Sequence, residues 1–540
     1  MDFKNIYSLF RAQTAKYGDR PVFFTHVEKG WESQTWEEFE DKVHDLACAL
    51  LAKELTKGAS VAILAGNIPE WTICDIATIA AGGVGVGIYP TSSAEQCEYV
   101  IDHSDAEFVV VDSAEQLKKL AGLELPTVRE IFVVNAAGLE GTLPTGRVSA
   151  FSDALAFGSA RRREFLPQIK EIGGNADADE TAIMVYTSGT TGKPKGAMLS
   201  HKYILNSVES LRRAVPIFET DIALSYLPGC HVAERISGIY NRLYNGTPAY
   251  FINDLSKLYE QMLDVKPTVF ASLPRFFEKI HASVIAKKGE ADVSEQDLKD
   301  AFGGRVRLLT SGGAPLPPEI AEFYRSRGLP ILQAYGLTEN ICVAFNTVDA
   351  NKFGTVGRPM PMCEVKIAAD REILVKSEMM FSGYYKEPER TSEMFDANRW
   401  LRTGDLGGVD EDGFLQITGR KKEIIVLSSG KNVAPALVEN YVKESHLISH
   451  CFLYGDGRSY CVALITVNLA EAAFATDLNV SIEEAVARAN ARVSSSERIK
   501  NYVVLDHDFS AERDEITPTM KLKRAVVARN YKAILENLYE

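Results

Sequence analysis

Apolar positions in the first 150 residues follow two different spacings. After Thr35, residues 36–53 place apolar side chains three and four positions apart, which is the spacing of one face of a helix. Short β-branched runs at residues 60–64, 108–111 and 131–134 have the length of buried strands. Strands that alternate with helices predict parallel sheets covered by helices.

The most apolar stretch, residues 71–89, contains Asp75 and four glycines. Because a bilayer span needs about 20 apolar residues in one continuous helix, we predict a buried helix, a glycine turn and a buried strand here. The N-terminus lacks a basic region followed by an apolar core, which argues against a signal peptide. We therefore expect a cytoplasmic protein without a transmembrane segment, in which peripheral contact with a membrane stays open.

Two polar stretches interrupt the alternation. Residues 157–180 are interpreted as a surface connection, and residues 287–299 as a solvated loop or helix. From 343 to 418 the strands are short and separated by turns, which predicts a small antiparallel β unit. After Arg420 the pattern becomes a compact α+β mixture, so we expect an N-terminal domain of residues 1–420 and a C-terminal domain of residues 421–540.

Length and charge narrow the function classes. A chain of 540 residues exceeds the size at which one core stops growing, so several domains are expected. It carries 59 Lys and Arg against 73 Asp and Glu, a net charge of -14, which argues against a nucleic-acid partner but allows a local basic pocket for a nucleotide. The eight cysteines form no CxxC pair, which is typical of reduced thiols rather than a zinc site.

Residues 186–196 form a loop rich in groups that bind phosphate, and they follow the apolar run 182–185. Glycines let the backbone come close to a ligand, and hydroxyls, N–H groups and lysines can all donate to phosphate oxygens. A P-loop is excluded, because only two residues separate Gly189 from Gly192 and Pro194 follows the lysine. A flexible surface turn is the remaining alternative. The candidate phosphate contacts are Thr187, Ser188, Gly189, Thr190, Thr191, Gly192, Lys193 and Lys195.

This loop resembles the signature loop of the adenylate-forming superfamily, which includes acyl-CoA synthetases, peptide-synthetase adenylation domains and firefly-type luciferases. The resemblance implies an α/β multi-domain fold. Its large N-terminal domain has two parallel-rich α/β subdomains and a small β-barrel-like unit, and a small mobile α+β domain follows. It also implies ATP, CoA and a carboxylic acid as substrates, and Mg²⁺ bound by Thr190 and Glu339.

Two further segments complete the adenine site in this resemblance. An aromatic face can stack on a purine, an amide can bond to its edge, and a carboxylate can hold Mg²⁺. By resemblance, Gln333 and Tyr335 hold adenine, Thr338 contacts the phosphates and Glu339 helps to bind Mg²⁺. The other residues that the resemblance places against ATP are Gly313, Ala314, Pro315, Ala334 and Gly336.

Residues 400–406 resemble the ribose site of the family. A carboxylate can accept hydrogen bonds from both ribose hydroxyls, so the resemblance gives this role to Asp405. Arg420 would also reach the ribose. Lys422 matches the hinge about which the C-terminal domain pivots between two half-reactions.

The remaining motifs concern the acid. By resemblance, Lys521 neutralises charge between the carboxylate and the α-phosphate. Lys523 is the alternative, and Met520 replaces the usual glycine of this motif. His231 matches a position beside the carboxylate pocket. Arg235 stands where some fatty-acid enzymes have a tryptophan gate.

Residues 267–279 and 430–435 resemble the long-chain branch of the family. We therefore predict an ATP-dependent fatty acid:CoA ligase for medium- to long-chain acids, which forms acyl-AMP and pyrophosphate and then acyl-CoA and AMP. One alternative is an adenylating ligase for another carboxylic acid or for a carrier-protein thiol. A second is a non-catalytic nucleotide- or lipid-binding homologue, which the presence of Lys521, Glu339 and Asp405 disfavours.

Overall fold

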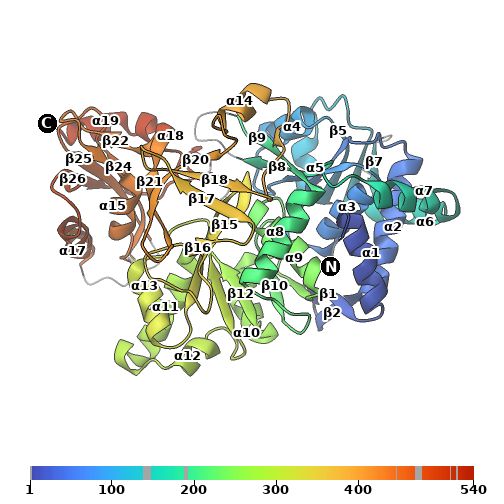
Figure 1. Cartoon of the computed structure of the whole chain (residues 1–540), viewed down its shortest axis with the longest axis horizontal. Coiled ribbons are helices and arrows are strands. Elements are labelled where there is room, and N and C mark those ends of the chain that lie inside the picture. Colours follow the sequence, from blue (N-terminus) through green and yellow to red (C-terminus); the bar gives the residue numbers. More distant parts are fainter. Residues whose placement is uncertain are drawn as a thin grey trace.

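The computed structural model describes residues 3–137, 147–187, 193–445, 447–468, 477–510, 512–517 and 521–540. In Figure 1 the N-terminal helices and the C-terminal part, coloured orange to red, lie at opposite ends of the molecule. The space between them contains two large sheets and a smaller antiparallel sheet. This arrangement confirms the predicted α/β fold with a small C-terminal domain.

An eight-stranded sheet forms the first α/β part, in the order β19-β9-β8-β4-β3-β5-β6-β7. Neighbours from β8 to β7 are parallel, whereas β9 pairs antiparallel with β8 and β19. The three runs predicted as buried strands are β3, β5 and β6. The strands are β3 (Ser60–Leu64), β4 (Val84–Ile88), β5 (Ala106–Ser113), β6 (Glu130–Asn135), β7 (Val148–Ala150), β8 (Thr181–Thr187), β9 (Lys195–Ser200) and β19 (Gly383–Tyr384).

Helices cover this sheet, and two of them confirm sequence predictions. Thr35 caps α2 (Trp36–Ala52) in a capping box, because Glu38 N donates to Thr35 Oγ1 over 3.2 Å and Thr35 N donates to Glu38 Oε2 over 2.8 Å. Helix α3 (Pro69–Ala80) and β4 are buried along nearly their whole length, as predicted for residues 71–89. The other helices of this part are α1 (Ile6–Tyr17), α4 (Ala94–His103), α5 (Ala114–Leu120) and α8 (His201–Ala214).

Residues 157–180 lie mostly at the surface, as interpreted, but most of them are helical, which was not predicted. This stretch contains the end of α6 (Phe151–Ser159) and all of α7 (Arg162–Asn175), and both helices contact α2. Ile169 and Gly173 of α7 are buried four residues apart, although Pro167 lies inside the helix. The many charged residues and the proline hid this narrow apolar stripe from the sequence analysis.

A nine-stranded sheet forms the second α/β part, in the order β16-β15-β14-β13-β12-β10-β11-β1-β2. Its strands are β1 (Pro21–Val27), β2 (Gly30–Thr35), β10 (Ala223–Ser225), β11 (Ala249–Phe251), β12 (Val269–Ser272), β13 (Leu308–Ser311), β14 (Ile331–Leu337), β15 (Asn340–Phe345) and β16 (Arg358–Pro359). Its helical elements are the π-helix η1 (Ala233–Tyr240), α9 (Asn241–Asn245), η2 (Leu255–Lys257), α10 (Leu258–Val265), α11 (Pro274–Lys288), η3 (Glu290–Asp292), α12 (Glu295–Asp300) and α13 (Pro318–Ser326). The polar stretch 287–299 is thus the end of one helix, a turn and the start of another.

The antiparallel β unit is a four-stranded sheet in the order β17-β18-β20-β21. Strands β15 and β16 precede it but extend the nine-stranded sheet. The elements of the unit are β17 (Cys363–Ile367), β18 (Glu372–Ser377), α14 (Pro388–Glu393), β20 (Leu401–Val409) and β21 (Leu415–Arg420). The antiparallel pairing agrees with the prediction from its short strands and turns.

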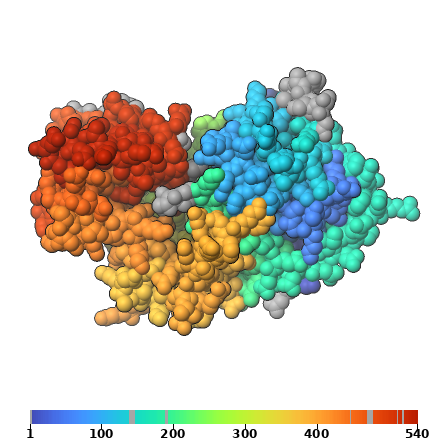
Figure 2. All heavy atoms as spheres, turned by 90° about the horizontal axis from the view of Figure 1, so that it is seen from above, coloured from blue at the N-terminus to red at the C-terminus, as the bar shows by residue number. Residues whose placement is uncertain are grey.

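The C-terminal part has its own buried cores. The three-stranded sheet β24-β25-β26 has apolar clusters on both faces, one under α15 and α17 and one under α18 and α19. Its elements are η4 (Lys421–Glu423), β22 (Ile425–Val426), β23 (Asn432–Val433), α15 (Pro435–Val442), β24 (Ile448–Tyr454), β25 (Cys461–Val467), α17 (Leu478–Ala491), β26 (Ile499–Val504), α18 (Arg524–Asn530) and α19 (Lys532–Asn537). Figure 2 shows that the surface is hollowed between this part and the N-terminal part. The division at residues 420 and 421 stays a prediction.

Two further sequence expectations concern the environment of the chain. Within the described ranges, no helix is both long enough and apolar enough to span a bilayer. All eight cysteines are free, and burial raises the pKa of each thiol. They are therefore reduced structural thiols, as expected.

Candidate active site

The glycine-rich loop joins two antiparallel strands of the eight-stranded sheet. Thr187 ends β8 and Lys195 begins β9, where the two residues pair. The predicted contacts Ser188, Gly189, Thr190, Thr191 and Gly192 lie outside the described residues. Lys193 Nζ lies 4.9 Å from the Tyr99 ring centroid, and Lys195 Nζ lies 4.7 Å from that of Tyr384. Aromatic faces attract cations at this distance, so both ammonium groups are held beside the loop.

Glu339 lies in the turn between β14 and β15 and is held from the β19 region. The Tyr384 hydroxyl donates to Glu339 Oε1, and Phe381 N donates to Glu339 O over 2.9 Å. Burial, followed by the Glu339 charge, raises the pKa of Tyr384, so its hydroxyl remains a donor. Sequence reasoning missed Tyr384, although its position in the run Gly383-Tyr384-Tyr385 was visible.

Thr338 is fixed by a different tyrosine. Tyr203 of α8 donates its hydroxyl to Thr338 O over 2.9 Å and accepts from Ile341 N over 3.0 Å. Gly336 precedes this turn, and a Cβ there would lie 1.8 Å from Ile341 O. Only glycine fits such a close approach, so the turn that presents Thr338 and Glu339 is packed against its own return strand.

The residues around Glu339 show whether this part of the site fits a bound Mg²⁺. Among the residues that the structure describes, His, Cys, Asp and Glu form no cluster of three with the geometry of a metal site. Mg²⁺ commonly binds through one or two carboxylates together with the phosphates of a substrate. Glu339 is a buried carboxylate whose partner Tyr384 also lies against Lys195 of β9, and one such carboxylate fits Mg²⁺ that arrives with ATP. Thr190, the other predicted ligand, is outside the described residues.

The adenine and ribose motifs meet at Asp405. Tyr335 donates its hydroxyl to Asp405 Oδ2 over 2.6 Å, and Arg420 Nε lies 2.8 Å from Asp405 Oδ1. The antiparallel register of β20 and β21 places Asp405 opposite Arg420. The structure therefore brings together residues from the nine-stranded sheet and the four-stranded sheet, 70 positions apart in the case of Tyr335 and Asp405.

The adenine segments are also neighbours. Strands β13 and β14 are parallel, and Ser311 pairs with Gln333 where β13 ends. Residues at the ends of parallel strands meet at one edge of a sheet. The loop after β13 is exposed at this edge and contains the predicted contacts Gly313, Ala314 and Pro315, while Ala334 continues β14.

Lys521 of the C-terminal part interacts electrostatically with two residues of the ribose motif. Protein atoms crowd its ammonium group and lower its pKa, and the charge of Arg420 lowers it further, whereas Asp405 acts in the opposite direction. The side chain is still accessible to solvent. Lys523 instead forms an ion pair with Asp514 of its own domain. Of the two candidate lysines, Lys521 is therefore the one beside the ribose motif. Met520 lies outside the described residues.

His231 is the second neighbour of Lys521. Burial and then the positive charge of Lys521 lower the pKa of His231 to about 4, so the ring is neutral at pH 7. Its Nδ1 lies 3.2 Å from the Ala233 N–H, which donates to it, so the proton of the neutral ring is on Nε2. A neutral imidazole of the N-terminal part and the ammonium group of Lys521 thus act on each other electrostatically.

The comparison with known families follows this geometry. The model of the family of AMP-binding enzymes matches residues 10–385, and the model of the AMP-binding enzyme C-terminal domain matches residues 422–540. The chain belongs to the family of AMP-binding enzymes. This finding confirms the resemblance that the glycine-rich loop indicated.

Individual members of the family match nearly the whole chain. The chain is 33% identical over 585 residues to "Long-chain-fatty-acid–CoA ligase FadD15" of Mycobacterium bovis, covering 96% of this chain and 94% of that protein. It is 30% identical to "Long chain acyl-CoA synthetase 6, peroxisomal" of Arabidopsis thaliana, covering 92% of this chain and 80% of that protein. The A-PCP didomain of a carboxylic acid reductase from Segniliparus rugosus, solved with AMP, has the same fold, with a TM-score of 0.83, 23% identity and coverage of 100% and 82%.

Arg235 follows His231 in this AMP-binding enzyme but is closed off from solvent. Its guanidinium forms an ion pair with Asp75 of α3 and donates from Nη1 to Met184 O over 3.3 Å. Tyr240 donates to the same carboxylate over 2.7 Å. A Cβ at Gly85 of β4 would lie 2.2 Å from Asp75 Oδ1. The sequence indicated Arg235 as unusual but not its partner, although a charged residue in the apolar stretch 71–89 was the available signal.

Lys422 lies in η4, directly after β21, and is exposed. The neighbouring Lys421 bonds to Asp370 over 2.6 Å and to Glu372 over 3.0 Å, which ties η4 to the four-stranded sheet. The connection between the two parts of the chain is therefore anchored on one side. The hinge role of Lys422 stays a prediction.

Proposed function

We propose that this AMP-binding enzyme is an ATP-dependent fatty acid:CoA ligase for medium- to long-chain acids. The observation that carries the proposal is that Lys521 of the C-terminal part interacts electrostatically with the Asp405–Arg420 pair, to which Tyr335 is hydrogen-bonded. A ligase that forms an acyl-adenylate needs a mobile positive charge at this place. The names of the curated relatives support fatty acids as the substrate class.

In the first half-reaction, a carboxylate oxygen attacks the α-phosphorus of ATP, and the bond to pyrophosphate breaks. Both reactants are anions, so catalysis consists mainly of positioning and charge neutralisation. Lys521 neutralises charge between them, Thr338 contacts the phosphates, and neutral His231 lies beside the carboxylate. Glu339 would hold Mg²⁺, which would supply further charge neutralisation when bound with ATP. Asp405 and Arg420 hold the ribose, and Gln333 and Tyr335 hold the adenine.

In the second half-reaction, the CoA thiolate attacks the carbonyl carbon of acyl-AMP, and AMP leaves with the bonding electron pair. Lys521 is not required for this step. We propose that residues 421–540 rotate about Lys422 and withdraw Lys521 between the two steps. Domain movement of this kind sets the turnover rate of many enzymes.

Pyrophosphate release tests the proposed function. The protein is incubated with ATP and Mg²⁺ and with acids from acetate to oleate, with and without CoA. The proposal predicts release that is greatest with the longer fatty acids and that turns over only with CoA. Release without CoA-dependent turnover would indicate another acceptor such as a carrier-protein thiol, and release with a different acid would indicate another substrate class. No release with any acid would contradict the proposal.

A further inference from the structure

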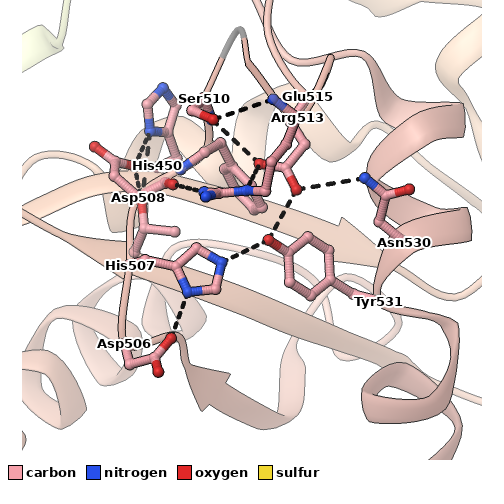
Figure 3. A network of polar contacts seen from close by, with 11 residues as sticks. His450, Asp506, His507, Asp508, Ser510, Arg513, Glu515, Asn530 and Tyr531 are labelled. Atoms are coloured by element: carbon pink, nitrogen blue, oxygen red, sulfur yellow. Dashed lines mark hydrogen bonds and ion pairs between the residues drawn. The ribbon is translucent and has the colours of Figure 1, made fainter.

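The polar network of Figure 3 contains a glutamate that the proposed reaction does not use. Glu515 is completely buried. Its carboxylate accepts from Tyr531 Oη over 2.8 Å, Arg513 Nε over 3.0 Å, Ser510 N over 3.1 Å and Asn530 Nδ2 over 3.4 Å. Burial by itself raises the pKa of Glu515, but these donors outweigh it and lower the pKa below its ordinary value. The group is therefore an ionised carboxylate with every oxygen satisfied.

Residues 515–517 pair with residues 521–523 as the two arms of a hairpin, and Lys521 lies on the second arm. We call the end of the hairpin at Glu515 and Lys523 its root. Lys523 N donates to Glu515 O over 2.8 Å, and Thr517 N donates to Lys521 O over 2.8 Å. Lys521 N in turn donates to Thr517 Oγ1 over 3.1 Å. Two residues of extended chain separate the two pairs, which corresponds to about 7 Å. Glu515 thus fixes the hairpin two residue positions away from the pair that contains Lys521.

The apolar contacts of the hairpin lie at the same root. Between the two hydrogen-bonded pairs, Ile516 and Leu522 form an antiparallel bridge. Ile516 is buried in an apolar cluster of the C-terminal part, and Leu522 packs against that cluster. The other buried members are Phe452, Val462, Leu464, Leu505, Phe509, Val527, Tyr531 and Leu535. The root is therefore packed inside the C-terminal part, whereas the charges that act most strongly on Lys521 are those of Arg420 and Asp405 in the N-terminal part, followed by Glu423 of η4.

We propose that Glu515 is a positioning residue for Lys521, and that its ionised carboxylate fixes the angle at which the hairpin enters the active-site cleft. The inference rests on the proposed function, because it assigns a consequence to the position of Lys521. Glu515 touches no substrate. A displacement of about 1 Å at a reacting centre can slow a reaction about 100-fold, so loss of the anchor slows the step that needs Lys521.

Glu515→Gln tests the inference, with Asp508→Asn as its matched control. Gln keeps the shape of the side chain but replaces the anion with an amide, which cannot accept all the donors. Asp508 belongs to the same network and accepts from His450, from Thr466 Oγ1 over 2.6 Å and from Phe509 N over 2.9 Å. Its side chain has no bond to the hairpin in the structure described, so D508N perturbs the network without releasing the root.

Both half-reactions are measured separately, as pyrophosphate release from acid and ATP and as thioester formation from supplied acyl-AMP and CoA. E515Q is expected to lower adenylation about 10- to 100-fold while thioester formation stays within about twofold. D508N should leave both steps within about twofold. In the Lys521→Ala background, E515Q should cause no further loss, because coupled residues are not additive. Equal loss of both steps, or a full further loss in that background, would overturn the inference.

Hydrogen exchange supplies a readout that needs no activity. E515Q should speed amide exchange at Thr517 and Lys523, whose amides donate to Lys521 O and Glu515 O, and D508N should not. Unchanged exchange in E515Q would overturn the inference even if the protein proved not to be a ligase. If E515Q fails to fold, Tyr531→Phe removes one donor and should lower adenylation alone by a smaller factor, about threefold to tenfold. Equal loss of both steps in Y531F would overturn the inference as well.

Discussion

The two sides of the nucleotide site are held in different ways. On the N-terminal side, Asp405 is bonded from two sheets by Tyr335 and Arg420, and Glu339 is bonded by Tyr384 from a third sheet. On the C-terminal side, Lys521 extends from one short hairpin. The side that must hold the nucleotide in both half-reactions is braced by several sheets. In the proposed mechanism, the side that acts in only one of them leaves by rotation of residues 421–540.

The largest effect is expected from Lys521→Ala. Removing a positive charge aimed at the developing charge of a transition state costs about 10²- to 10³-fold, so pyrophosphate release should fall by at least that factor. Lys523→Ala is the control, since Lys523 pairs with Asp514 inside its own domain. A loss with K523A as large as that with K521A would show that the wrong lysine was assigned.

Arg235→Ala should lower the stability of the fold rather than change either half-reaction selectively. It leaves the Asp75 carboxylate buried without its guanidinium, which typically costs about 3–5 kcal/mol. Arg212→Ala is the control, because its ion pair with Glu209 is largely exposed at the arginine end and contributes about 0–1 kcal/mol. Urea unfolding measures both, and an R235A protein as stable as R212A would contradict the structural role of the buried pair.

Asp405→Asn should weaken nucleotide binding by the N-terminal side of the site. A hydrogen bond to a charged group contributes about 1.5–3 kcal/mol, so both half-reactions should slow about 10- to 100-fold, and the KM for ATP should rise. Asp396→Asn removes a carboxylate that only accepts from turn N–H groups and should leave the KM unchanged. Loss of only one half-reaction in D405N would contradict the claim that the N-terminal side serves both half-reactions.

Tyr384→Phe tests the N-terminal side of the site with a smaller expected effect. It removes the hydroxyl that orients Glu339, so adenylation should fall about 10-fold and should need more Mg²⁺. The neighbouring Tyr385 bonds to Asp105 over 2.7 Å, and Tyr385→Phe should stay within about twofold of the wild type. A titration of activity against Mg²⁺ compares the two variants, and identical curves would contradict the role of Tyr384.

The sequence indicated the family through its nucleotide motifs, because each is a short contiguous run whose chemistry depends on local residue types. The alternation of helices and strands also predicted the parallel sheets covered by helices. Tyr384, Asp75 and Glu515 were not predicted as functional or paired residues, since each depends on a partner brought close only by the fold. Helix α7 was missed for a related reason, because its buried stripe is narrow and its charged face dominates the sequence.

The most direct test of this difference between the two sides of the site is thioester formation by the Lys521→Ala variant from synthetic acyl-AMP and CoA. If Lys521 serves only adenylation, this rate should stay within about threefold of the wild type while pyrophosphate release from the same preparation is almost lost. A parallel loss of both rates in a folded K521A protein would contradict the account, because it would make the mobile side as necessary for the second step as for the first.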